Sequence, residues 1–134
     1  YAVNSGFHLG KLHWNISTSQ QGNELPVQWN ANNIGAVLKA GHLSISNSRY
    51  DLTSYGRSVG LLADAFYFVY RPLNGDGEIV AKLDSFNASG KNAQAGLMIR
   101  ESSWIGSKHA YLNINPQGQG YFQYRWLSIG ATST

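Results

Sequence analysis

The sequence predicts an all-β fold, an antiparallel β-sandwich, on three observations. Aromatic residues make up 13% of the 134 residues and stand with β-branched residues in short runs, which is typical of strands. Turn residues, above all fifteen Gly, separate these runs. Within several runs apolar and polar side chains alternate with the period of a half-buried strand, and no segment has a convincing helical period. Short strands without helices indicate two packed sheets.

The first third of the chain is polar and uneven. Residues 1–33 read as an N-terminal extension, or as a first edge strand and a loop, with the strand at Leu12–Ile16. Residues 34–134 form the β-sandwich module, and the sequence leaves open whether residues 1–26 belong to it. Because the chain starts at Tyr1 rather than Met, we expect a processed or excised piece of a longer protein.

The middle of the chain predicts three strands. His42–Ser46 alternates in period two, and Tyr50–Gly60 then reads as a loop. Ala65–Tyr70 is a dense aromatic run that an Arg-Pro pair ends. Asn74–Gly77 supplies turn residues that tolerate positive φ, and Glu78–Phe86 follows as the next strand.

Three further strands alternate clearly, at Ala95–Arg100, His109–Ile114 and Tyr121–Trp126, and a Pro-Gly turn joins the last two. We assign the apolar side chains to the core face: Leu97, Ile99, Leu112, Ile114, Phe122 and Trp126. We assign the mixed side chains to the outward face: Met98, Arg100, His109, Tyr111, Asn113, Tyr121, Gln123 and Arg125.

The composition excludes several classes of protein. With 13% charged and 43% hydrophobic residues, the chain is neither a disordered tail nor a coiled coil, and its length suits one domain. The absence of Cys excludes disulfide bonds, thiolate metal sites and cysteine catalysis. The formal charge is +3, but the ten Lys and Arg are scattered, so we expect no nucleic-acid partner. No apolar stretch is long enough to cross a bilayer, so we expect no membrane insertion.

Three ordered motifs resemble a known family. They are DAFYFVYRPLNGDGEIVAKLDSF (Asp64–Phe86), AQAGLMIRES (Ala93–Ser102) and SKHAYLNINPQGQGYFQYR (Ser107–Arg125). Together they resemble bacterial concanavalin A-like domains, some of which are named after "regulation of enolase". The resemblance spans about Asn33 to Arg125 and implies a jelly-roll fold. It also implies an appended module of secreted, multidomain bacterial proteins, beside polysaccharide-degrading or adhesive domains.

Members of this family continue past the last matched strand with several more strands. Here the chain stops at Thr134, so the resemblance implies a module truncated at its C-terminal end. An unfinished sandwich exposes strand edges, which pair readily with other chains. We therefore expect strands from neighbouring copies or from other domains of the parent protein.

The outward face of the last three strands is the candidate binding surface. Its ligand-binding residues, with one loop residue added, are Arg100, Trp104, Tyr111, Asn113, Tyr121, Gln123 and Arg125. A sugar presents an apolar C–H face to an aromatic ring, while its hydroxyls need directional partners such as guanidinium and amide groups. The alternative is that these residues serve β-propensity and solubility, with Trp104 as a loop anchor.

Metal binding and catalysis have weaker support. We expect no cofactor, with calcium as the one candidate. Asn74, Asp76 and Glu78 could supply oxygen ligands to a calcium ion. The alternative is that these residues only form the turn that precedes the next strand. No nucleophile motif and no H-E-x-x-H spacing occurs, so we expect no enzyme. A glycoside hydrolase would need two facing carboxylates, and Glu78 with Glu101 would be that pair.

The sequence thus predicts a non-catalytic, secreted module that binds a polysaccharide, another glycan or another surface polymer. The alternative is a structural building block of an extracellular assembly or filament, completed by strands from a partner. A hydrolase is the third and least supported hypothesis.

Overall fold

The structure is a computed structural model that describes residues 2–6, 11–17, 29–46, 49–57, 59 and 62–134. For residues 2–6 and 11–17 it describes the backbone. Every regular element within these ranges is a strand, so the predicted all-β, antiparallel fold is confirmed. The described part contains no helix that could span a membrane.

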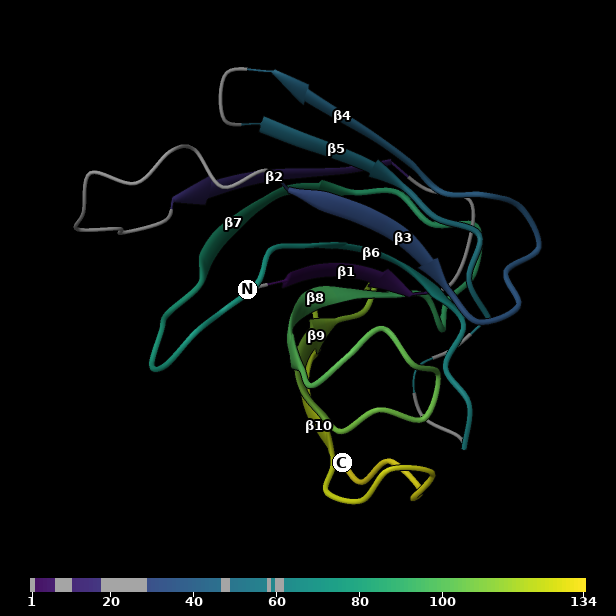
Figure 1. Cartoon of the computed structure of the whole chain (residues 1–134). Helices are drawn as coiled ribbons and strands as arrows, with labels where there is room; N and C mark the ends of the chain where they lie inside the picture. The colour runs from purple at the N-terminus through teal and green to yellow at the C-terminus, as the bar shows by residue number, and fades with distance from the viewer. Residues whose placement is uncertain (1, 7–10, 18–28, 47–48, 58, 60–61) are drawn as a thin grey trace.

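Ten strands follow one another along the described chain. They are β1 (Ala2–Gly6), β2 (Lys11–Ser17), β3 (Asn30–Ile34), β4 (His42–Ser46), β5 (Arg49–Thr53), β6 (Phe66–Tyr70), β7 (Val80–Phe86), β8 (Gln94–Arg100), β9 (His109–Ile114) and β10 (Gly120–Arg125). They form a six-stranded sheet in the order β10-β9-β8-β1-β6-β3 and a four-stranded sheet in the order β4-β5-β2-β7. In Figure 1, β8, β9 and β10 continue downward, away from the four-stranded sheet.

Two predictions for the first half of the chain are wrong. The expected edge strand at Leu12–Ile16 is the interior strand β2, which lies between β5 and β7. The expected loop over Tyr50–Gly60 begins with β5, where Tyr50 and Leu52 point into the core. The alternation of these two residues with Asp51 has the period of a strand, although the polar residues around them resemble a loop.

The two sheets pack against each other through a cluster of Tyr50, Leu52, Tyr67, Val69 and Ala95. A second cluster lies on the other face of the six-stranded sheet and contains Ile34, Val59, Phe66, Phe68, Met98 and Tyr111. Strand β6 contributes to both clusters, so both of its faces are buried. That double burial explains its uninterrupted aromatic run, because a strand buried on both faces needs no polar side chain.

The predicted facing of β8, β9 and β10 is wrong at most positions, although Leu97 packs against the core and Tyr121 is exposed, as expected. The supposedly outward Met98, His109, Tyr111, Asn113 and Arg125 are all buried. The supposed core residues are exposed instead: Ile99 by 50%, Leu112 by 56%, Phe122 by 55% and Trp126 by 78%. The four-stranded sheet ends at β7, whose Ala81 and Leu83 lie beside Leu97 and Leu112 at a shallow hollow. The apolar face of β9 and β10 extends beyond that edge.

Candidate functional site

A buried ion cluster organises one end of the six-stranded sheet. Arg100, His109 and Arg125 form one row across β8, β9 and β10, because strand register pairs Arg100 with His109 and His109 with Arg125. The carboxylate of Asp64 sits on this row. It accepts hydrogen bonds from Arg100 Nη1 at 2.7 Å and from Arg125 Nη2 and Nη1 at 2.7 and 2.9 Å. All three side chains are at most 1% exposed.

The two guanidinium groups also fasten the loops that surround the cluster. Arg125 donates to the carbonyl oxygens of Ser107 at 3.1 Å and Gly130 at 2.8 Å. Arg100 donates to the carbonyl oxygens of Ser102, at 2.8 Å, and of Trp104. These bonds fix residues 101–107 and 126–133 against the sheet, so the loops are held by the same ions that neutralise one another.

His109 completes the cluster as a neutral side chain. Its Nδ1 lies 3.3 Å from the Ser107 carbonyl oxygen and 4.0 Å from the Asp64 carboxylate. Burial lowers the pKa of His109 more than the nearby Asp64 raises it. The cation side of the cluster is therefore Arg100 and Arg125, and Nδ1 acts as the donor to the carbonyl.

A pocket of about 340 Å³ opens beside the cluster, at the ends of β6 and β8. We call it the β6–β8 pocket. Its lining is Phe68, Tyr70, Arg71, Pro72, Leu73, Met98, Ile99, Arg100, Glu101, Ser102 and Ser103. The lining combines aromatic rings with hydroxyl, carboxylate and guanidinium groups, a mixture suited to small polar ligands with an apolar face.

The aromatic wall of the pocket is a stacked pair. The rings of Phe68 and Tyr70 lie 5.1 Å apart at an interplanar angle of 17°. The Tyr70 hydroxyl accepts a hydrogen bond from Asn32 Nδ2 at 3.0 Å, which fixes the ring from β3. Tyr70 is half-buried, so part of it remains accessible to a ligand. Beside it, the Arg71 guanidinium stands 5.3 Å from the centre of the Trp29 ring.

The polar wall follows β8. Glu101 is exposed and forms an ion pair with Lys108 at 3.4 Å, and Ser103 is exposed next to it. The Ser102 hydroxyl lies 3.2 Å from that of Ser107, within the loop that the ion cluster holds. The carboxylate of Glu101 can accept hydrogen bonds, and the hydroxyl of Ser103 can both donate and accept.

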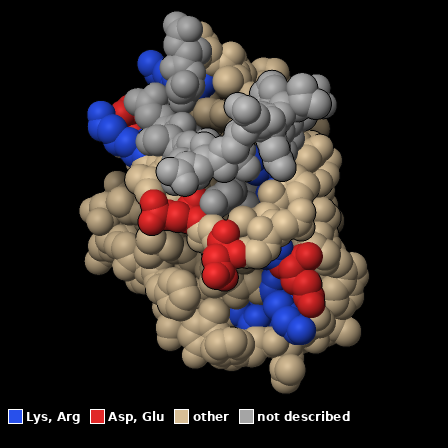
Figure 2. Space-filling model, turned by 60° about the vertical axis from the view of Figure 1, so that its left-hand side comes forward, with Lys and Arg blue, Asp and Glu red and all other residues tan. Residues whose placement is uncertain are grey.

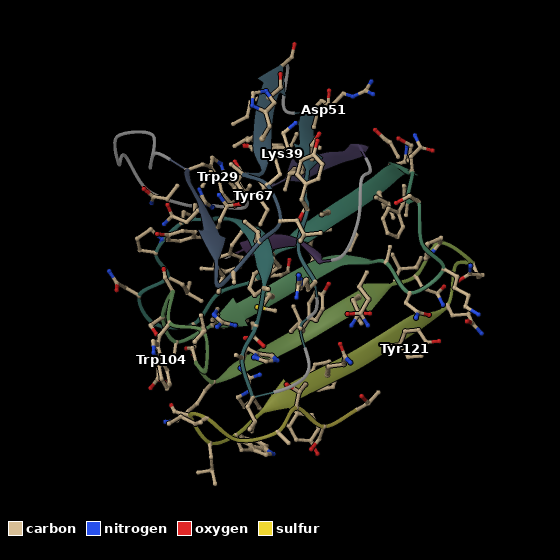
Figure 3. The ribbon with its side chains drawn as sticks, turned by 90° about the vertical axis from the view of Figure 1, so that its right-hand side faces the viewer. Trp29, Lys39, Asp51, Tyr67, Trp104 and Tyr121 are labelled. Carbon is tan, nitrogen blue, oxygen red and sulfur yellow. The ribbon has the colours of Figure 1, made fainter. Side chains whose placement is uncertain are left out.

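The structure disperses the predicted binding residues. Tyr111, Asn113 and Arg125 lie in the interior, and Arg100 lines the pocket, but its guanidinium is already bonded to Asp64. Gln123 accepts a hydrogen bond from Asn113 Nδ2 at 3.0 Å. Trp104 and Tyr121 are exposed, but they lie at opposite ends of β8 to β10 (Figure 3). No single outward surface brings these seven residues together.

Sequence reasoning missed Asp64, Tyr70 and Ser103. The position of Tyr70 at the end of a strand could have been predicted from the sequence. It ends an aromatic run just before an Arg-Pro pair, and proline is typical of the place where a strand leaves its sheet. Asp64 could also have been singled out, because it is a lone acid directly before that aromatic run. An acid in such a place needs a buried cation, and the row of Arg100 and Arg125 supplies two.

The predicted calcium ligands lie on an exposed turn before β7. Gly75 has a positive φ of 74° between Asn74 and Asp76, a conformation that glycine adopts readily. Within the described residues, no three His, Cys, Asp or Glu side chains gather closely enough to hold a metal. Calcium binding by Asn74, Asp76 and Glu78 therefore stays a prediction, as does the carboxylate pair of Glu78 and Glu101.

A second, larger groove of about 740 Å³ lies on the opposite face of β8 to β10. Its lining is largely apolar and includes Ile99, Ala110, Phe122, Tyr124 and Trp126. Figure 2 shows acidic and basic side chains interspersed over the face that it turns forward. The Lys and Arg side chains in that view form no broad basic patch.

Comparisons with protein-family models, with curated proteins and with solved structures find no match to this chain. The resemblance to concanavalin A-like domains therefore rests on the sequence motifs.

Proposed function

We propose that this chain is a non-catalytic binding module that holds carbohydrate, or another surface polymer, in the β6–β8 pocket. The observation that carries the proposal is the stacked pair of Phe68 and Tyr70 beside the polar groups of Glu101 and Ser103 in one pocket. A pyranose ring needs both elements, because it has an apolar C–H face and a rim of hydroxyl groups.

The frame of the pocket favours binding over chemistry. The loop that carries Glu101 and Ser103 is tied down by Arg100 and Arg125 through the buried Asp64. A rigid loop loses little conformational entropy when it orders around a ligand. Glu101 already pairs with Lys108, which suits a hydrogen-bonding carboxylate better than a general acid.

The size of the pocket suggests what it holds. About 340 Å³ is near the lower end of the roughly 300–1,000 Å³ typical of small-molecule sites. We infer that it takes a single sugar unit, such as the end or a side branch of a polymer, rather than a long stretch of chain.

The sequence motifs supply the setting of this function. Their resemblance to concanavalin A-like domains supports a jelly-roll sandwich, carried as an appended module in a secreted bacterial protein. In that setting the module keeps its parent protein close to a polymer. The inference is an analogy at the level of the fold, and the pocket is the part of it that can be tested directly.

A glycan array followed by isothermal titration calorimetry tests the proposal. We expect one class of glycan to bind, and Tyr70→Ala to weaken its affinity about tenfold, the effect of losing about 1.4 kcal/mol of stacking. Tyr121→Ala is the control, because Tyr121 is an exposed tyrosine that lies outside the pocket. Titrations with calcium and with a chelator test the turn at Asn74–Glu78 in the same experiment.

The second candidate function is a structural building block of an extracellular assembly. The observation that favours it is the apolar face of β9 and β10, which extends beyond the edge of the four-stranded sheet in the described part of the chain. Its test is the mass of the protein in solution.

A further inference from the structure

The uncovered face has the composition of a protein core. Strand register places its side chains in two rows, one of Ile99, Ala110 and Tyr124 and one of Leu112 and Phe122. Leu97, which begins the second row, already packs against the cluster between the two sheets. Trp126 extends the surface past the end of β10, and its ring lies 5.6 Å from that of Tyr124. We call these residues the β8–β10 apolar face. A contiguous apolar surface of this kind marks an interaction site in a soluble protein.

The β8–β10 apolar face is also nearly neutral. The charged residues at its groove are Glu101 and Lys108, which pair with each other, and Arg100, His109 and Arg125, which belong to the cluster around Asp64. A partner that carries a strong charge of either sign would find no counterpart in this lining. An apolar partner would meet no unpaired charge in it.

The edge of the sheet is a poorer docking site than its face. Backbone hydrogen bonds join Tyr124 and Ser133 in both directions at 2.9 Å, so the C-terminal segment caps part of the outer edge of β10. Gln123 Nε2 also lies 3.4 Å from Thr134 Oγ1 at the same edge. A covered edge resists the addition of a further strand, so at this end of the sheet the face is the better docking surface.

We propose that the β8–β10 apolar face binds a second copy of this chain, face to face about a two-fold axis. Among the described residues, no layer covers β9 and β10 in either copy, and each copy offers the same two strands as that layer. A two-fold contact brings one surface patch against itself, and an apolar, neutral patch is complementary to itself. The inference does not depend on the carbohydrate proposal, and it gives the building-block function a defined partner.

The exposed area is sufficient for such a dimer. The exposed fractions of Ile99, Leu112, Phe122 and Trp126 leave on the order of 500 Å² of side chain per copy, so two copies bury about the 1,000 Å² in total that a specific interface needs. This value lies at the small end of specific interfaces. We therefore expect a reversible dimer whose population depends on protein concentration.

Sedimentation equilibrium across a wide range of protein concentration tests the proposal. We expect a monomer–dimer equilibrium in the unmodified protein, and Leu112→Glu to raise the dimer dissociation constant at least about a hundredfold, because it buries an unpaired carboxylate. Leu38→Glu is the matched control, since Leu38 is 72% exposed and lies outside this face. Trp126→Ser, at a position 78% exposed, gives a second variant whose folding does not depend on the β9 strand.

A monomer at every concentration would overturn the inference, and so would a dimer that Leu112→Glu and Trp126→Ser leave unchanged. Circular dichroism of each variant shows whether it is folded. Glycan affinity distinguishes the two proposals, because Leu112→Glu should leave it unaltered while Tyr70→Ala should leave the mass unaltered. Loss of one property without the other identifies the surface concerned.

Discussion

Asp64 and Arg125 are joined by two parallel hydrogen bonds of 2.7 and 2.9 Å, across 61 residues of sequence, with both side chains fully buried. The pair connects the segment before β6 to the last strand of the same sheet. Arg100 shares the same carboxylate, so a single acid pairs with two guanidinium groups. The loops around the proposed pocket depend on this arrangement for their position.

Asp64→Asn should lower the free energy of unfolding by about 3–5 kcal/mol, because it leaves two buried guanidinium groups without their anion. Urea denaturation measures the change. Asp51→Asn is the control, since Asp51 pairs with Arg49 at the surface, where such a pair contributes about 1 kcal/mol at most. Equal losses in the two variants would show that the buried cluster has no special importance.

Stability should fall as the pH drops below about 6.5, the ordinary pKa of histidine. Because burial lowers the pKa of His109 in the folded protein, the unfolded chain takes up the proton first, and acid favours unfolding. Thermal unfolding between pH 8 and pH 5 measures the effect. His109→Gln should flatten the profile over this range.

Tyr111→Phe should leave the protein as stable as before or more stable. The Tyr111 hydroxyl is buried and has no hydrogen-bond partner in the described structure, so its removal costs no bond and relieves a desolvated group. Chemical denaturation checks this, and glycan affinity should stay unaltered because Tyr111 does not line the pocket. A large loss of stability would mean that the hydroxyl has a bonded partner, such as an ordered water.

Gly35→Ala should destabilise the protein by more than about 1–2 kcal/mol, the cost of a left-handed conformation for a residue with a Cβ. Gly35 follows β3 with a φ of 66°, and a Cβ there would lie 2.0 Å from the Asp64 carbonyl oxygen. Gly75→Ala serves as the comparison, because Gly75 has a similar φ of 74° but no atom close to the position of the added Cβ. We expect the first substitution to be clearly the more damaging.

The fold class could be predicted from the sequence because it depends on local properties. Aromatic runs, period-two alternation and turn residues locate β6, β7, β8, β9 and β10 to within a few residues. The partners of each strand could not be predicted in the same way. Strands β1 and β2 lie inside the sheets because they pair with strands that are distant in the sequence. Both partners of β1, for example, are about 60 residues away or more.

The candidate site could be predicted only in part, and the reason lies in the facing of β8 to β10. Alternation distinguishes two faces of a strand, and the more apolar face is ordinarily the buried one. Here the face with Met98, Arg100, Tyr111 and Arg125 is buried, because Asp64, from a distant segment, pairs with both of its guanidinium groups. No property local to these strands reveals that acid, so the predicted binding and core faces were exchanged at most positions, with Leu97 and Tyr121 as exceptions.

The most direct test of the proposed function is the affinity of a glycan, identified on the array, for the unmodified protein and for Tyr70→Ala, Tyr121→Ala and Trp104→Ala. Binding in the β6–β8 pocket predicts about a tenfold loss for Tyr70→Ala alone. A loss for Trp104→Ala or Tyr121→Ala, with Tyr70→Ala unchanged and folded, would place the ligand elsewhere and contradict the proposal. The absence of any glycan ligand for the folded protein would contradict it as well.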